Sequence, residues 1–234
     1  MRVLVTRPLR SGQRTAKRLR DMGHEPVLLP LSQPVHDGKA AMDALARSHG
    51  PIAITSAEAV RALASSGADI RPYSRRLVFA VGEASANEAK AAGFASVLAS
   101  AGDGARLAEL IAAQTRQSVT YLAGSPRAET FERSAHALGL KVDVAECYRM
   151  QPAEPDPGAL REALTPPPEA IVLYSRTTAE RFFRLPEVRS EPGWLNQALI
   201  LCLSTSVAAA VPASIGRNLR IAALPDERSL LSLL

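Results

Sequence analysis

Residues 2–30 read RVLVTRPLRSGQRTAKRLRDMGHEPVLLP. The short apolar runs at residues 2–6 and 26–30 predict two buried strands. The intervening segment has apolar side chains at three-residue spacing, which predicts an amphipathic helix over residues 13–22 that starts after Ser11-Gly12. A strand, a helix and a strand joined by short turns form a βαβ unit. This unit implies an α/β fold built on a parallel sheet.

The same alternation continues along the rest of the chain. Further strands are predicted over residues 52–55, 77–81, 96–98, 119–122, 142–149, 170–174, 199–203 and 220–223. Helices are predicted over residues 56–63, 84–92, 106–113, 129–138, 178–184 and 206–211, and at the C-terminus. The proline-rich segment 152–168 is interpreted as a connection between elements.

An internal repeat indicates two similar domains. The segment ITSAEAV, residues 54–60, resembles LYSRTTA, residues 173–179. Each joins the end of a predicted strand to a serine and then a helix. Further along each copy, Asp103 and Asp226 are candidate N-caps of short helices. A repeat on this scale predicts two α/β domains of related design.

The second copy lacks a first βα unit of its own, and the N-terminal residues would supply it. We therefore expect one discontinuous α/β domain made of residues 1–34 and 151–234. A second α/β domain, residues 37–146, would be inserted into the first. Residues 31–36 and 146–151 are expected to form the two linker strands.

Composition excludes several classes of protein. The 234 residues are 47% hydrophobic and 22% charged, which is ordinary for a globular chain and excludes a disordered one. The net charge of +5 is spread along the sequence, so it suits an anionic ligand without indicating nucleic acid. The longest clear apolar run, residues 198–203, is far shorter than the roughly 20 residues that span a bilayer. Since the start does not resemble a signal peptide, we expect a cytoplasmic protein with no membrane partner.

Cysteine and histidine usage argues against metal and disulfide sites. The two cysteines, Cys147 and Cys202, form no C-x-x-C pair, and the four histidines stand far apart. The phosphate-loop, dinucleotide-binding and nucleophile-elbow motifs are also missing from the sequence.

Polar residues instead recur where predicted strands turn into helices. In open parallel sheets, ligands bind beyond the carboxyl ends of the strands, and helix N-termini there favour anions. The candidate ligand-binding residues are Thr6, Arg7, Thr55, Ser56, Gly82, Ser85, Gly124, Ser125, Ser175, Thr177, Ser204 and Ser206. For each hydroxyl taken alone, the alternative is a simple helix N-cap. Their repetition in both predicted domains favours a large polyanionic ligand.

Tyr148 is a separate candidate, just before the predicted return linker. A phenol can donate a hydrogen bond or act as a general acid. The alternative is a linker tyrosine that only packs.

In their order along the chain, these motifs resemble the uroporphyrinogen-III synthase family. The resemblance rests on VLVTRP (3–8), LLPL (28–31), ITSAEAV (54–60), AVGEASA (80–86), LAGSPRAE (122–129) and LGLKVDVAECYR (138–149). It implies two flavodoxin-like α/β domains joined by a two-stranded linker, with a flexible cleft between them.

The resemblance also implies an activity. Members of this family cyclise hydroxymethylbilane to uroporphyrinogen III in haem biosynthesis, with loss of water and inversion of ring D. They use no metal and no cofactor. Tyr148 matches the family's candidate proton donor, while Thr55, Ser56, Gly82, Ser85 and Ser175 match polar turns of the family. We also expect a monomer, since no large apolar surface stripe is evident in the sequence, and a partner contact limited to a transient one with the preceding pathway enzyme.

The sequence departs from the family pattern at three places, and the departure at residues 204–207 keeps an alternative open. Ser204-Thr-Ser-Val207 stands where the family commonly has Gly-Pro-Thr-Thr, Tyr174 replaces a threonine, and the turn at residues 124–129 is atypical. The alternative function is a non-catalytic two-domain clamp that binds a tetrapyrrole or another anion. A nucleotide-dependent regulator is a third interpretation, disfavoured by the missing phosphate loop.

Overall fold

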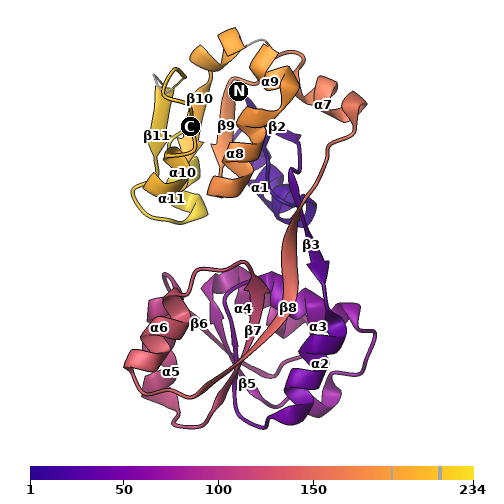
Figure 1. The fold of residues 1–234 in the computed structure, drawn as a ribbon, viewed down its shortest axis with the longest axis vertical. Helices are drawn as coiled ribbons and strands as arrows, with labels where there is room; N and C mark the ends of the chain where they lie inside the picture. Colours follow the sequence, from indigo (N-terminus) through magenta and orange to yellow (C-terminus); the bar gives the residue numbers. More distant parts are fainter. Residues whose placement is uncertain (191, 216–217) are drawn as a thin grey trace. The chain divides into compact units, whose positions relative to one another are not determined.

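The computed structural model describes residues 1–190, 192–215 and 218–234. The chain divides into two units. Unit 1 comprises Met1–Gln33 and Gln151–Leu234, and unit 2 comprises Pro34–Met150. Each unit has its own sheet with helices packed on both faces (Figure 1).

Unit 1 contains most of the C-terminal elements together with the first three. They are β1 (Arg2–Val5), α1 (Leu9–Asp21), β2 (Glu25–Leu28), α7 (Pro157–Leu164), β9 (Ala170–Leu173), α8 (Arg176–Arg184), α9 (Pro186–Ser190), η2 (Pro192–Asn196), β10 (Leu199–Cys202), α10 (Thr205–Ala208), β11 (Leu219–Ile221) and α11 (Glu227–Leu231).

Unit 2 contains the middle of the chain. Its elements are α2 (Gly38–Arg47), β4 (Ile52–Ile54), α3 (Ala57–Ser65), η1 (Arg71–Tyr73), β5 (Leu77–Val81), α4 (Gly82–Ala91), β6 (Ser96–Ser100), α5 (Gly104–Gln114), β7 (Val119–Ser125) and α6 (Thr130–Ala137). The strands β3 (Ser32–His36) and β8 (Val142–Pro152) run across the boundaries between the units.

The sheet of unit 1 has the order β2-β1-β9-β10-β11, and its strand pairs are parallel. Counted along the unit, this is the order 2-1-3-4-5 of flavodoxin-like sheets. The central strands are covered on both faces, which is why they are continuous apolar runs instead of alternating ones. Val3, Leu4 and Val5 of β1, for example, are all fully buried.

The sheet of unit 2 has the order β3-β8-β7-β4-β5-β6, and β8 to β6 are parallel. Here β7 and β8 lie beside β4 in the places that β1 and β2 take beside β9. The strands β4-β5-β6 therefore correspond to β9-β10-β11, which are the two copies of the sequence repeat. The two sheets therefore share one strand order. In unit 1 the strands at the first two places, β1 and β2, precede the repeat in sequence, whereas in unit 2 the strands at these places, β7 and β8, follow it. The predicted α/β class with two parallel sheets is confirmed.

The linker strands β3 and β8 are neighbours and run antiparallel. At one end the Asp37 amide donates to the Cys147 carbonyl over 2.7 Å, and at the other the Ala153 amide donates to the Leu31 carbonyl over 3.1 Å. Partner numbers fall as residue numbers rise, which is the antiparallel pattern. The chain leaves unit 1 on one of these strands and returns on the other.

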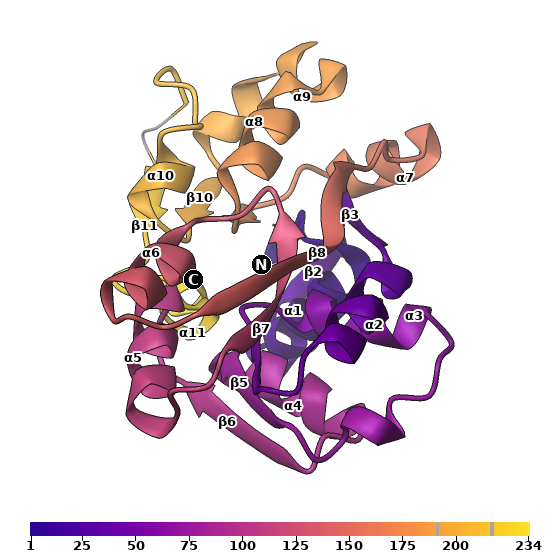
Figure 2. The same ribbon diagram turned by 60° about the horizontal axis from the view of Figure 1, so that its bottom comes forward.

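The core of unit 2 has two layers, one on each face of its sheet (Figure 2). Helices α2, α3 and α4 cover the face that carries Ile52 and Ile54. Helices α5 and α6 cover the opposite face, where Phe79 and Tyr121 are buried. Successive residues of each strand thus contribute to opposite layers.

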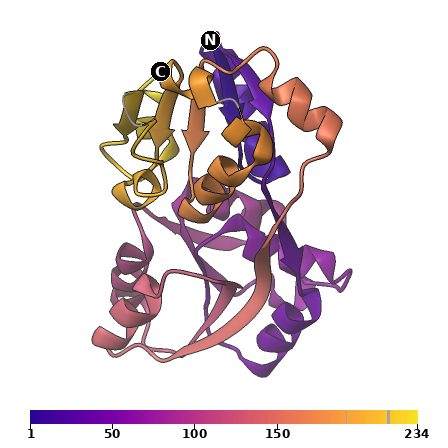
Figure 3. The same cartoon turned by 45° about the horizontal axis from the view of Figure 1, so that its top comes forward.

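The core of unit 1 is divided in the same way. Helices α7, α8 and α9 cover the face that carries Leu4, and Phe182 of α8 is buried there. The orange helices α8 and α9 lie in front of the strands in Figure 3. Helices α1 and α11 pack with Val3 and Leu19 on the other face.

Two helix N-caps were predicted and are confirmed. The Asp103 carboxylate accepts a hydrogen bond from the Ala105 amide over 2.9 Å at the start of α5. The Asp226 carboxylate accepts one from the Ser229 amide over 2.7 Å at the start of α11. These bonds satisfy amides that a helix leaves unpaired at its first turn.

The helix starts were predicted less well. Helix α1 begins at Leu9 and not after Ser11-Gly12, because the Pro8 carbonyl already accepts the Gly12 amide over 2.8 Å. Helix α7 lies within the segment 152–168, for which the sequence predicts only a connection. Pro157 in fact stands in its first turn, where proline loses no helical hydrogen bond, and Asp156 caps it. Helix α2, capped by Asp37, was not predicted.

No helix in the described ranges is long and apolar enough to span a membrane. Among the same residues, histidine, cysteine and acidic side chains form no group of three or more suited to a metal ion.

Candidate functional site

The carboxyl ends of the central strands gather the predicted ligand-binding residues of each unit. In unit 2 the strand order reverses between β4 and β7. Thr55-Ser56 follows β4, and Gly124-Ser125 ends β7. In unit 1 the order reverses between β1 and β9, where Thr6-Arg7 and Ser175 follow the two strands. A reversal of this kind opens the crevice in which α/β sheets bind ligands.

Tyr148 lies at an irregularity of the unit 2 sheet. In the ladder between β7 and β8, Ala123 pairs with Glu146 but Gly124 pairs with Tyr148, so Cys147 is an extra residue. Such a β-bulge turns the following side chain away from its regular direction. The bulge therefore sets where the Tyr148 phenol points.

Gly124 is required by the Tyr148 ring. A Cβ atom built on Gly124 would lie 2.6 Å from both Cε2 and Oη of Tyr148, and closer still to Cζ. A Cβ atom does not approach non-bonded atoms so closely, so the phenol occupies the space that a side chain at position 124 would take. The predicted residues Gly124 and Tyr148 thus form one structural feature.

The Tyr148 hydroxyl is protonated at neutral pH. Burial raises the pKa of Tyr148 to about 12, and a side-chain hydrogen bond with Ser56 offsets only part of that effect. The Ser56 hydroxyl also accepts the Glu58 amide over 3.2 Å, as the N-cap of α3. A protonated phenol held by a serine is suited to donating a hydrogen bond or a proton.

A second tyrosine lies on β7 opposite Ala53 of β4, the strand that leads to Thr55. Tyr121 is only 1% exposed, and its hydroxyl is 2.9 Å from the Thr55 hydroxyl. Burial raises the pKa of Tyr121, so this phenol also keeps its proton. The Thr55 hydroxyl is therefore already within hydrogen-bonding distance of a core residue. Tyr121 was not predicted as part of the site, because it appears in the sequence as an ordinary strand residue.

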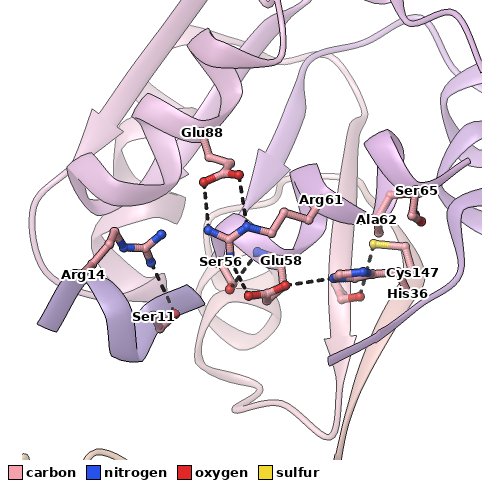
Figure 4. A network of polar contacts seen from close by, with 11 residues as sticks. Ser11, Arg14, His36, Ser56, Glu58, Arg61, Ala62, Ser65, Glu88 and Cys147 are labelled. Carbon is pink, nitrogen blue, oxygen red and sulfur yellow. Dashed lines mark hydrogen bonds and ion pairs between the residues drawn. The ribbon is translucent and has the colours of Figure 1, made fainter. Parts of the chain in front are cut away.

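A buried network of charges lies beside the Ser56 turn (Figure 4). His36 Nε2 is 2.8 Å from Glu58 Oε2, and Arg61 contacts the other oxygen of Glu58. Arg61 also donates to both carboxylate oxygens of Glu88, over 3.0 and 2.8 Å. Glu58 and Arg61 are 7% and 6% exposed. Burial alone would lower the pKa of Arg61, but its hydrogen bonds and the charges of Glu88 and Glu58 outweigh that effect and raise it.

Unit 1 has a charged cluster of its own at the carboxyl end of β1. The Arg7 guanidinium lies 4.1 Å from the centre of the Tyr174 ring and 2.8 Å from Glu227. The Tyr174 hydroxyl donates to the same carboxylate over 2.9 Å, and Thr15 and Arg18 contact it as well. The predicted binding residue Arg7 is thus paired within the protein. Glu227 was not predicted, since 220 positions separate it from Arg7.

The remaining predicted residues differ in exposure. Thr6 and Ser85 are 1% and 5% exposed, and the Thr6 hydroxyl has no hydrogen-bond partner among the residues that the structure describes. Ser204 caps α10 by accepting the Val207 amide over 3.4 Å. Gly82 opens α4 with a φ of 71°, a conformation that favours glycine. Three predicted hydroxyl residues are exposed at the starts of α8 and α10: Ser175, Thr177 and Ser206.

Comparison with known proteins identifies the family. The family model of uroporphyrinogen-III synthase HemD matches residues 13–232. The chain is also similar to the uroporphyrinogen-III synthetase of Helicobacter pylori, with a TM-score of 0.65 and 15% identity over 100% of this chain and 98% of that one. A mutant uroporphyrinogen III synthase of Thermus thermophilus gives a TM-score of 0.53 and 22% identity over 90% and 87% of the two chains.

The comparison with curated proteins gave no match. At these identities the solved structures support the fold, and the family model supplies the assignment. Its match extends over both units and includes the turns after β4, β5, β7, β9 and β10, whereas Thr6-Arg7 precedes it. The chain therefore belongs to the uroporphyrinogen-III synthase family.

Proposed function

We propose that this enzyme of haem biosynthesis acts as a hydro-lyase that cyclises hydroxymethylbilane to uroporphyrinogen III. The family match over residues 13–232 supports the reaction. The hydroxyl group of ring A leaves as water and gives an azafulvene. Ring D attacks through its substituted carbon to form a spiro intermediate, which opens and recloses with ring D inverted. The pyrroles supply the electrons, so no metal or cofactor takes part.

Tyr148 is the proposed proton donor for the leaving hydroxyl group. Hydroxide is a poor leaving group, and protonation in the transition state makes it leave as water. The raised pKa of Tyr148 keeps the proton on the phenol at neutral pH, and Ser56 restricts its direction. The bulge and the missing side chain of Gly124 support this role because they hold the ring in one place.

The substrate carboxylates are proposed to bind at the strand-to-helix turns. Hydroxymethylbilane carries eight carboxylates, and helix N-termini supply unpaired amides and a positive dipole for such groups. Ser175, Thr177 and Ser206 are exposed at two of these N-termini in unit 1. In unit 2 the turns after β4, β5 and β7 carry the corresponding residues. Holding a flexible chain in a folded geometry is itself a large part of such catalysis.

The enzyme is further proposed to work as a cytoplasmic monomer that meets the preceding pathway enzyme only transiently. Exposed large apolar residues such as Leu9, Leu98 and Leu224 are dispersed along the chain and do not gather on one element. Light scattering on the purified protein tests the monomer. A stable dimer at micromolar concentration contradicts it.

A coupled assay tests the reaction. Hydroxymethylbilane is generated in place, the protein is added in the presence of EDTA, and the oxidised porphyrins are separated by chromatography. Uroporphyrin III above the blank supports the proposal. Uroporphyrin I alone, formed at the rate of the blank, overturns it, and tight binding of the tetrapyrrole without turnover identifies the non-catalytic clamp instead.

A further inference from the structure

A series of contacts in unit 2 links the first turn of α3 to the strand that carries Tyr148. Ser56, the N-cap of α3, lies near enough to the Tyr148 phenol on β8 to lower its pKa. Ser56 accepts the amide of Glu58 in the first turn of that helix. The Glu58 carboxylate meets His36 on β3. Asp37, next to His36, donates its amide to the carbonyl of Cys147, which precedes Tyr148 on β8.

The link between β3 and α3 is made by two side chains, those of His36 and Glu58. His36 Nε2 and Glu58 Oε2 are 2.8 Å apart, and the two side chains are 20% and 10% exposed. Arg61 holds the second oxygen of Glu58, and Glu88 in turn holds Arg61 in a two-pronged pair (Figure 4). The carboxylate is therefore fixed on both sides. Because both of its oxygens are held, the Glu58 carboxylate couples the position of β3 to the position of the first turn of α3.

We propose that His36 and Glu58 are a positioning pair for Tyr148. They fix the first turn of α3, and hence the Ser56 hydroxyl, relative to the strand that carries the phenol. The inference rests on the proposed role of Tyr148 as proton donor. Neither His36 nor Glu58 contacts the phenol through a hydrogen bond, so both act through Ser56 and not on the substrate.

The test combines substitutions at His36 and Tyr148. The His36→Ala variant loses the contact, and kcat is expected to fall about tenfold with KM changed less than about twofold, since a small misplacement of a catalytic group lowers the rate and not the binding. The His36→Gln variant keeps a donor near the position of Nε2 and is expected to retain at least about half of kcat. His136→Ala, an exposed histidine on α6, is the matched control with unchanged kcat.

A double-mutant cycle separates positioning from general structural damage. In a Tyr148→Phe background the hydroxyl that His36 positions is already absent. Adding His36→Ala should then lower kcat no further, although it lowers kcat about tenfold in the wild-type background. Thermal melting of every variant accompanies the kinetics. Should His36→Ala not fold, His36→Asn replaces it, because the shorter side chain does not reach Glu58.

The possible results have distinct meanings. Wild-type kcat in His36→Ala, or full additivity with Tyr148→Phe, overturns the positioning pair and leaves Tyr148 as proton donor. Equal losses in His36→Gln and His36→Ala also overturn it. A Tyr148→Phe variant with wild-type kcat instead removes the proposed proton donor itself, so the two failures can be told apart.

Discussion

A single missing side chain decides where the Tyr148 phenol lies. Replacing Gly124 by alanine would place a methyl group 2.6 Å from Cε2 and Oη of the ring. The ring must move, because the strand backbone on which Gly124 lies is held in the ladder with β8. We expect Gly124→Ala to destabilise the protein by about 1–3 kcal/mol and to lower kcat at least about tenfold.

Urea unfolding and the coupled assay measure these two effects. Gly193→Ala is the matched control, since Gly193 is exposed in η2 and a Cβ there meets open space. Its free energy of unfolding should change by less than about 0.5 kcal/mol. Full activity in Gly124→Ala would mean that the ring tolerates a different position.

Tyr148→Phe tests the same residue by removing only its hydroxyl group. The pyrroles cyclise slowly without help, so kcat should fall about 10- to 100-fold without reaching zero. Because the pKa of Tyr148 is raised to about 12, the wild-type enzyme should lose no activity through this phenol between pH 7 and pH 9. A loss of activity in that range that disappears in Tyr148→Phe would contradict the assignment.

At the scale of the element, helix starts depend on single carboxylates. Asp103 accepts the amides of Ala105 and Arg106 at the start of α5. We expect Asp103→Ala to cost about 1 kcal/mol of stability in urea unfolding, and Asp103→Asn to cost much less because asparagine also caps helices. Equal losses in the two variants would show that the charge matters more than the cap.

Helix α11 is tied to α1 and to the end of β9 through Glu227, and this tie depends on pH. Burial alone would raise the pKa of Glu227, but the bond from Thr15 and the charge of Arg7 outweigh it and lower the pKa. A lowered pKa stabilises the fold at pH values above the unfolded value, about 4.3, and this contribution is lost as pH falls through the folded pKa. Glu227→Gln should therefore show a weaker loss of stability below about pH 4 than the wild type.

Free energies of unfolding measured from pH 3 to pH 7 test this prediction. Glu25→Gln is the matched control in the same unit, since the Glu25 side chain is 73% exposed. It should keep the pH dependence of the wild type. Identical curves for wild type and Glu227→Gln would show that the cluster around Arg7 contributes no pH-dependent stability.

The elements could be predicted from sequence where one local pattern determines them. Strands such as β5 are apolar runs bounded by turns, because both faces of a parallel strand are buried. Helix α7 could not be predicted in this way, since Pro157 gives the same local signal in a connection as in a first turn. The residues that follow the strands were found because sheet topology places ligands there. The partners of those residues were not, since His36 and Glu58 meet only once the chain has folded.

At the scale of the whole molecule, each unit carries the core that it needs. The buried clusters around Leu4 and Val3 consist of unit 1 residues, and those around Ile52 and Phe79 consist of unit 2 residues. We expect the fragment 34–150 to fold alone. Residues 1–33 joined to 151–234 by a short glycine-rich link should fold too, because the Ala153 amide bonds to the Leu31 carbonyl close to both cut ends.

Circular dichroism and urea unfolding of the two fragments check this expectation. Each should give native-like spectra and one cooperative transition. A fragment 34–150 that unfolds without cooperativity would mean that its sheet depends on unit 1.

The insertion of unit 2 has a consequence for the way the chain is made. The strand β1 needs β9 on one side, and β9 begins at Ala170, after all of unit 2 has been synthesised. On the ribosome, unit 2 is complete in sequence once Met150 has emerged, while β1 can have paired only with β2. Strand β1, which is synthesised before unit 2, thus gains its second neighbour only after unit 2 is complete. While the inserted unit is being synthesised, one edge of β1 therefore remains unpaired. Chaperones protect surfaces of this kind.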